Sequence, residues 1–168
     1  MSFGNGSLKI IDLGSCYIFN NKQLCNTYIQ SRYYRAPEVV MGCDYSFGID
    51  IWSFGCIIAE LLLNTPLFKA KNQRDLIFKI ASLIGIPKET IYTNSCYHSK
   101  YFRSNYNNKL TDNQRFVDTS ETYGRLYKKY EKHNLENLLF ENCIENDILN
   151  ATKYEIKFMI QMIKDIIV

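Results

Sequence analysis

The sequence lacks the features that mark several classes of protein. Its six cysteines form no Cys-x-x-Cys pair, so neither a zinc site nor a redox motif is indicated. Lys128-Lys129 is the only adjacent basic pair and the net charge is +3, which argues against nucleic-acid binding. The N-terminus has no basic start followed by an apolar stretch, so no signal peptide is expected. These absences favour a chain that works in a reducing intracellular compartment, the cytoplasm or the nucleus.

The chain does have enough apolar sequence for one folded domain, because 46% of its 168 residues are hydrophobic. The strongest helical pattern covers residues 48–64, where apolar side chains occupy nearly every face. A helix that is apolar all round is expected to be buried in a protein core. Asp50 and Glu60 interrupt this run, which is also too short to cross a membrane.

Weaker patterns predict the remaining elements. Apolar residues recur at helical spacing over 73–84 and over a terminal helix at about 153–168, and Pro37 can open a short helix. Two short strands are expected, at Leu8–Ile11 and Cys16–Phe19. Residues from about 88 to 150 are expected to form loops with one or two short helices, with the best candidate at 123–133.

Three motifs follow one another in the first third of the chain. Asp12-Leu13-Gly14 comes directly after the first predicted strand, and a carboxylate at this place suits a hard cation. The stretch Tyr28–Glu38 follows, with the sequence Tyr-Ile-Gln-Ser-Arg-Tyr-Tyr-Arg-Ala-Pro-Glu. Asp50-Ile51-Trp52-Ser53-Phe54-Gly55 then opens the apolar helix. Taken alone, Asp12 could be a polar strand end, and Asp50 could be a helix N-cap or first-turn carboxylate.

The order and spacing of these motifs resemble the activation segment of a eukaryotic protein kinase. Tyr28–Glu38 and Gly48–Leu61 are similar to the dual-specificity tyrosine-regulated kinases of the CMGC group. The resemblance implies a mainly α fold: part of a kinase C-terminal lobe with a short β-ribbon near the N-terminus and no N-lobe. Residues 1–168 would then be one partial kinase domain, with the activation segment at 12–38, the buried helix at 48–64, a CMGC-type insert at about 88–150 and the terminal helix.

The resemblance also implies roles for single residues. Asp12 would hold Mg²⁺ against ATP, although Leu stands next to it where the family usually has Phe. Ser31 would hydrogen-bond the catalytic aspartate in the floor that receives the substrate residue after the phosphoacceptor. Glu38 would pair with an arginine late in the lobe. Asp50 would reach backbone N–H groups of the catalytic loop, and Trp52 would pack beneath the activation segment.

The family carries a Tyr-x-Tyr pair in its activation loop, and here the first position is Asn26. Tyr28 holds the second position, the one whose phosphorylation organises the loop in the family. Arg32 and Arg35 follow at four and seven residues, so their guanidinium groups are expected to clamp the phosphate. This prediction assumes a loop that has little else to order it. Tyr28 could instead be an ordinary aromatic packing residue.

A glycine-rich phosphate loop, a strand lysine and a His-Arg-Asp catalytic loop are absent from the sequence, so no catalytic base is present. We therefore expect this chain to be inactive alone. The parent protein is expected to transfer phosphate from ATP, with Mg²⁺, to Ser and Thr of protein substrates and to Tyr by autophosphorylation. Neither nucleic acid nor membrane is expected as a partner. The alternative is a non-catalytic remnant of a kinase lobe that binds peptides. An unrelated helical scaffold would need three ordered motifs by coincidence.

Overall fold

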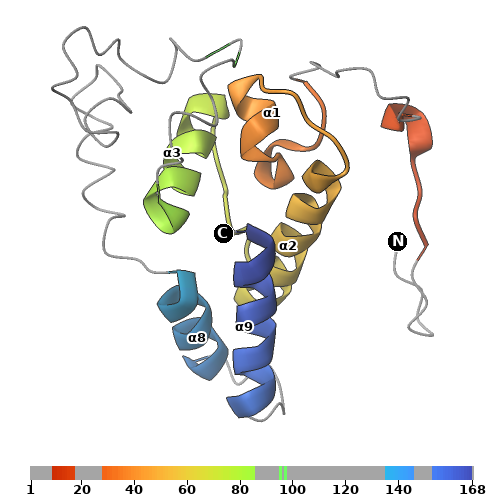
Figure 1. Ribbon diagram of the computed structural model, residues 1–168. Coiled ribbons are helices and arrows are strands. Elements are labelled where there is room, and N and C mark those ends of the chain that lie inside the picture. Colours follow the sequence, from red (N-terminus) through yellow and green to blue (C-terminus); the bar gives the residue numbers. More distant parts are fainter. Residues whose placement is uncertain are drawn as a thin grey trace, which may run out of the picture.

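The computed structural model describes residues 9–17, 28–85, 95, 97, 135–145 and 153–167, and this part of the chain is mainly α-helical (Figure 1). It contains the 3₁₀ helices η1 and η2 and five α-helices: η1 (Leu13–Ser15), η2 (Arg32–Tyr34), α1 (Pro37–Met41), α2 (Gly48–Leu63), α3 (Gln73–Ile84), α8 (Leu135–Glu145) and α9 (Lys153–Ile167). The prediction of a mainly α fold is confirmed. None of these helices is long and apolar enough to cross a membrane.

Helix α2 is the centre of the described core. It packs against α9 and α8, which also pack on each other, and Figure 1 shows α2 and α9 side by side. The helix ends at Asn64, whose left-handed φ of 54° turns the chain out of the helix. The face that α2 buries carries Ile49, Trp52, Gly55, Cys56, Ala59, Leu62 and Leu63.

The prediction that α2 is buried all round is wrong for one of its faces. Ile51, Phe54, Ile57 and Leu61 are each about half exposed or more, with Leu61 at 68%. We call these four residues the exposed apolar face of α2. They are exposed because α9, α8 and η2 contact α2 from other directions, and no other described element packs closely on it. The apolar pattern shows that a face can be buried, but burial also requires a partner.

The predicted β-ribbon is not found in the residues that the structure describes. Residues 9–11 and 16–17 form no strand, and the turn between them is η1. Ile10 is 92% exposed. A strand needs a neighbour that pairs its backbone groups, and no described segment supplies one here. Leu8, Ile18 and Phe19 lie outside the described residues.

Helix α3 has the bounds that the sequence pattern predicts, and local hydrogen bonds explain where it begins. The Asn72 side chain accepts a hydrogen bond from the Asp75 backbone N–H at 2.9 Å. The Asp75 carboxylate accepts one in turn from the Lys71 N–H at 2.8 Å. This reciprocal cap satisfies two donors at the start of the helix. The helix ends at Gly85, whose φ of 99° is accessible mainly to glycine.

Helices α8 and α9 lie at the C-terminal end of the described chain. Helix α9 lies where apolar spacing predicts the terminal helix, whereas α8 lies in the stretch expected to be mostly loop. The helix predicted at 123–133 lies outside the described residues. An ion pair between Lys164 Nζ and Glu136 Oε2, at 2.8 Å, connects the two helices on their exposed side.

Gly55 of α2 lies against the end of α9, and it provides a stability prediction. A Cβ atom at this position would lie 2.6 Å from Ile166 Cγ2 and 3.0 Å from Ile167 Cγ1. We expect Gly55→Val to lower the free energy of unfolding by about 1–3 kcal/mol, the usual effect of overpacking a core. Urea denaturation followed by circular dichroism measures the change. Gly48→Ala is the control, because a Cβ there meets nothing within 4 Å. Equal stability of the two variants would contradict the prediction.

Candidate functional site

Gln30 lies at the centre of a hydrogen-bond network that joins the Tyr28–Glu38 segment to α2. Its Nε2 donates to the Ile49 carbonyl at 2.6 Å and to Ser53 Oγ at 2.7 Å. Its Oε1 accepts from the Ala36 N–H at 3.0 Å. The backbone of Gln30 is left-handed, with φ of 65°, which is uncommon for a residue other than glycine. The three side-chain bonds hold this conformation in place. No pattern in the sequence indicated a role for Gln30.

Ser53 carries the network into α2. Its hydroxyl accepts from Gln30 and donates to the Tyr34 carbonyl at 2.8 Å. Both hydrogen-bonding capacities of this half-buried hydroxyl are therefore used to hold the segment against the helix. A lone serine within a run of apolar residues was the signal in the sequence that could have indicated such a contact.

Arg35 is buried, with 4% of its surface exposed. Its guanidinium group donates hydrogen bonds to the backbone of the Tyr28–Glu38 segment to which it belongs. Its Nε donates to the Ile29 carbonyl and its Nη2 donates to the Gln30 carbonyl, each at 2.8 Å. Burial, and then the charge of Arg32, lower the pKa of Arg35 from its ordinary value. An arginine nevertheless stays charged in proteins, so two backbone carbonyls face a permanent cation.

Tyr28 and Arg35 are in contact, whereas Arg32 is bonded elsewhere. The Arg35 guanidinium carbon lies 5.2 Å from the centroid of the Tyr28 ring, a cation–π arrangement. Tyr28 is 81% exposed. Arg32 Nη1 donates to the Lys71 carbonyl at 2.8 Å, across to the segment before α3. The expectation that little else orders this loop is wrong for its described part, because Gln30 and Arg35 hold it without a phosphate.

A second bond between the segment and α2 joins Tyr34 to Glu60. The Tyr34 hydroxyl donates to Glu60 Oε2 at 2.6 Å. This hydrogen bond, with burial as the next cause, raises the pKa of Tyr34 to about 12. Burial, followed by the charge of Glu60, raises the pKa of the Cys56 thiol to about 12 as well. Both groups therefore stay neutral at physiological pH. No pattern in the sequence indicated a contact between Tyr34 and Glu60.

Ser31 and Glu38 lie at the two ends of the same segment. Ser31 precedes η2 and is exposed, and its side chain forms no capping hydrogen bond there. Glu38 lies in the first turn of α1 and is half buried. Burial raises the pKa of its carboxyl group. Among the described residues, no cation forms an ion pair with Glu38. The arginine expected to pair with it is therefore not among them.

The raised pKa of Glu38 predicts a pH-dependent stability. Because the folded pKa lies above the unfolded value, folding favours the protonated form, and this group opposes folding once the pH exceeds both values. Glu38→Gln should therefore raise Tm at pH 7, and the gain should shrink as the pH falls towards 4. Thermal melts of both proteins at several pH values measure this.

Glu136→Gln provides the control with the opposite sign. The hydrogen bond from Lys164 lowers the pKa of Glu136, so this carboxylate favours folding above its unfolded pKa. Its removal should not raise Tm at pH 7. A lower Tm for Glu38→Gln at pH 7 would contradict the interpretation of Glu38 as a carboxylate buried without a cation.

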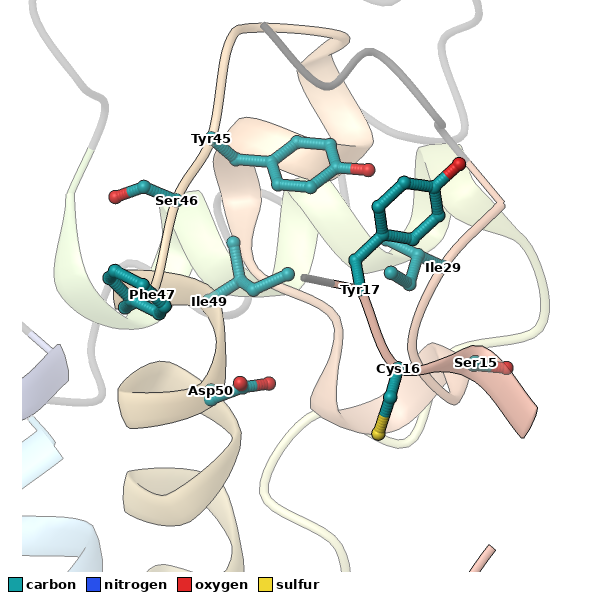
Figure 2. A pocket seen from close by; sticks show the side chains of 9 residues that line it. All are labelled: Ser15, Cys16, Tyr17, Ile29, Tyr45, Ser46, Phe47, Ile49 and Asp50. Atoms are coloured by element: carbon teal, nitrogen blue, oxygen red, sulfur yellow. The ribbon is translucent and has the colours of Figure 1, made fainter. Parts of the chain in front are cut away.

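Asp50 lies at the edge of a pocket of about 210 Å³ between the start of α2 and the segment that contains η1. Figure 2 shows Tyr17 and Tyr45 on one side of this pocket and Cys16 across from Asp50. Phe47 occupies the N-cap position of α2, so Asp50 is a first-turn carboxylate and not the N-cap. Asp50 itself is exposed.

Trp52 is buried and does not line this pocket. Its ring stacks on Phe68, with centroids 5.8 Å apart and an angle of 12° between the planes. Its Nε1 finds no hydrogen-bond acceptor in the described part of the chain. The described ring partner of Trp52 is thus a residue between α2 and α3.

Asp12 is exposed and precedes η1 with a left-handed φ of 62°. Aspartate adopts this conformation more readily than most residues, and such backbone is enriched at functional sites. One carboxylate is a possible ligand for Mg²⁺. However, the described residues contain no group of three or more His, Cys, Asp or Glu side chains that could hold a metal ion.

Comparison with known proteins places these motifs in one family. Residues 1–144 match the family model described as the protein kinase domain. The chain is 47% identical over 100 residues to dual specificity tyrosine-phosphorylation-regulated kinase 3 of Rattus norvegicus, which is 59% of this chain and 16% of that protein. It is 40% identical over 122 residues to serine/threonine-protein kinase ppk5 of Schizosaccharomyces pombe, covering 71% of this chain and 14% of the relative. Homeodomain-interacting protein kinase 1 of Mus musculus is 40% identical over 100 residues, covering 60% of this chain and 8% of the relative.

Proposed function

The chain belongs to the protein kinase domain family, and from this premise we propose that it is the substrate-docking part of a kinase that phosphorylates Ser and Thr of proteins. The matched residues are a small part of each relative, so this proposal concerns the longer protein of which the chain would be a part. In that protein Tyr28 would be autophosphorylated. The similarity to kinases named as dual-specificity and serine/threonine enzymes supports this substrate class.

The observation that carries the proposal is the contact of Arg35 with the Gln30 carbonyl, at 2.8 Å. A peptide that lies along residues 29–31 would offer its backbone N–H groups to exposed carbonyls. Here the Ile29 and Gln30 carbonyls already accept hydrogen bonds from the buried guanidinium. A substrate residue at this place would leave its N–H without an acceptor. Proline has no N–H and loses nothing, so we propose that the residue after the phosphoacceptor is proline.

The nucleotide side of the proposed reaction involves Asp12 among the described residues. ATP supplies the phosphoryl group in this family, and Mg²⁺ neutralises the charge that develops during its transfer. Asp12 is the residue that would contribute a metal ligand.

Peptide kinetics with the longest gene product that contains this chain test the proposal. We compare peptides with Ser-Pro, Ser-Ala and Ser-(N-methyl-Ala) at the acceptor site. An unmet N–H costs about 1–3 kcal/mol, so Ser-Pro should exceed Ser-Ala in kcat/KM by about tenfold or more. N-methyl-alanine also lacks the N–H and should restore most of the difference. Equal use of Ser-Pro and Ser-Ala would overturn the proposed docking mode, and absence of phosphate transfer would overturn the kinase assignment.

A non-catalytic, peptide-binding role is the second candidate. It is favoured by one observation: the Tyr28–Glu38 segment, which we call the docking segment, is hydrogen-bonded to α2 through Gln30 and Ser53, and these bonds require neither Asp12 nor a nucleotide. The same experiment separates the two functions. A remnant would bind the Ser-Pro peptide, measured by calorimetry, but would not transfer phosphate to it.

A further inference from the structure

A second pocket lies away from the docking segment. It is formed by α3, by α8 and by the loop that follows α2. Its volume is about 250 Å³, and its walls include Pro66, Leu67, Leu83 and Leu138, with Lys69 and Lys79. In Figure 1, α3 and α8 lie on the same side of α2. None of the residues of the kinase motifs lines this pocket.

The size and walls of the pocket suit an apolar side chain. Pro66, Leu67, Leu83 and Leu138 are all half buried, so each presents apolar surface to the pocket while resting on the core. Sites for drug-sized molecules and cofactors usually have volumes of about 300–1,000 Å³. A pocket below this range fits one or two anchoring side chains of a peptide better than a complete cofactor.

The charges around the pocket are mainly positive. Lys79 Nζ donates to the Lys69 carbonyl and lies 3.6 Å from the Asp75 carboxylate, so Lys79 is partly neutralised. Lys69 is exposed, and the described structure gives its ammonium group no carboxylate partner. Among the described residues that line the pocket, the charged ones are Lys69 and Lys79. A partner with acidic side chains therefore meets a favourable field here.

We propose that this pocket binds a short peptide segment of another protein in which an apolar side chain stands beside Asp or Glu. The apolar side chain enters between Leu83 and Leu138, and the acidic side chain meets Lys69. This is a docking site beyond the proposed function, because it requires neither ATP nor the segment around Arg35. A partner protein would bind to this pocket without contacting the residues that receive the phosphoacceptor.

Fluorescence anisotropy with the full chain, fused to a carrier protein for solubility, tests the proposal. The probe is a labelled ten-residue peptide with a central Leu-Phe pair flanked by Asp and Glu. The comparison peptides replace the acidic residues by Lys, or Leu-Phe by Ser-Ser. We expect saturable binding of the first peptide only, with about tenfold or greater weakening in either replacement, the effect of losing about 1.4 kcal/mol.

Variants then locate the site. Lys69→Glu and Leu83→Asn should each weaken binding about tenfold, the former mainly at low salt, where charge interactions are least screened. Lys157→Glu on the exposed face of α9 changes the net charge equally but lies outside the pocket, so it should bind like the wild type. No binding of the acidic apolar peptide, equal binding of the lysine peptide, or equal loss in Lys157→Glu would each overturn the proposal.

Discussion

Purified alone and supplied with Mg²⁺, radiolabelled ATP and a Ser-Pro peptide, the 168-residue chain will transfer no phosphate above background. The sequence has no glycine-rich loop, no strand lysine and no His-Arg-Asp loop, so nothing in it grips the phosphates or orients the attacking hydroxyl. Phosphoryl transfer depends almost entirely on such positioning and charge stabilisation. Removing a single electrostatic donor costs roughly 10²–10³ in kcat, so the loss of several should remove all measurable turnover.

The control for this experiment is the Asp12→Ala variant. If the chain showed turnover and Asp12→Ala abolished it, the activity would belong to this chain and the prediction would be wrong. Turnover that survives Asp12→Ala would point to a contaminating kinase. Peptide binding can be measured whatever this assay shows. The hydrogen bonds that hold the docking segment against α2 form within this chain and require no phosphate transfer.

In the longest gene product, Tyr28→Phe should lose most of the activity towards peptides, about tenfold or more, since phosphate brings charge and three strong acceptors. Arg35 already uses Nε and Nη2 on backbone carbonyls, which leaves its Nη1 for a phosphate on the adjacent Tyr28. Arg32 would exchange its bond to the Lys71 carbonyl for the phosphate. The phenylalanine ring keeps the contact with Arg35, so this substitution tests the phosphate separately from packing.

Arg35→Lys extends the test. An ammonium group cannot hold the Ile29 and Gln30 carbonyls in the planar geometry of a guanidinium and also bind a phosphate. We therefore expect this variant to lose activity even where Tyr28 is phosphorylated. Full activity of Tyr28→Phe, with no phosphate on Tyr28 in mass spectra of the wild-type protein, would show that the switch is not used. The alternative, that Tyr28 is an ordinary aromatic packing residue, predicts full activity of Tyr28→Phe.

Helices with strong local patterns could be predicted from the sequence. The apolar spacing and the capping residues of α3 are local properties, and its bounds agree with the prediction. Helix α8 lies in the stretch where one or two short helices were expected, but its position was not predicted, although Leu135, Leu138 and Leu139 recur at helical spacing. The strands failed for a different reason: the pattern of Leu8–Ile11 is typical of a strand, but a strand forms only beside a pairing neighbour.

In the candidate site, too, local features could be predicted from the sequence, whereas contacts between distant residues could not. The motifs placed Arg35 and Tyr28 on one segment, and the structure brings them into contact. The bonds of Gln30 to Ser53 and of Tyr34 to Glu60 join residues 23 and 26 positions apart, so no local pattern specifies them. Ser53 and Glu60 were visible only as polar residues within an apolar helix. Their partners depend on how the segment lies against α2, which is a property of the tertiary structure.

The exposed apolar face of α2 has a consequence for the life of such a chain in a cell. Ile51, Phe54, Ile57 and Leu61 form a continuous row along one helix, and molecular chaperones bind apolar surface of this kind on incompletely folded proteins. If the chain were synthesised by itself, chaperones would bind it and proteases would degrade it. Its steady-state amount would then depend on the rate of degradation. Covering that row with a partner would lengthen its lifetime, so the abundance of the protein in a cell would report whether the face is occupied.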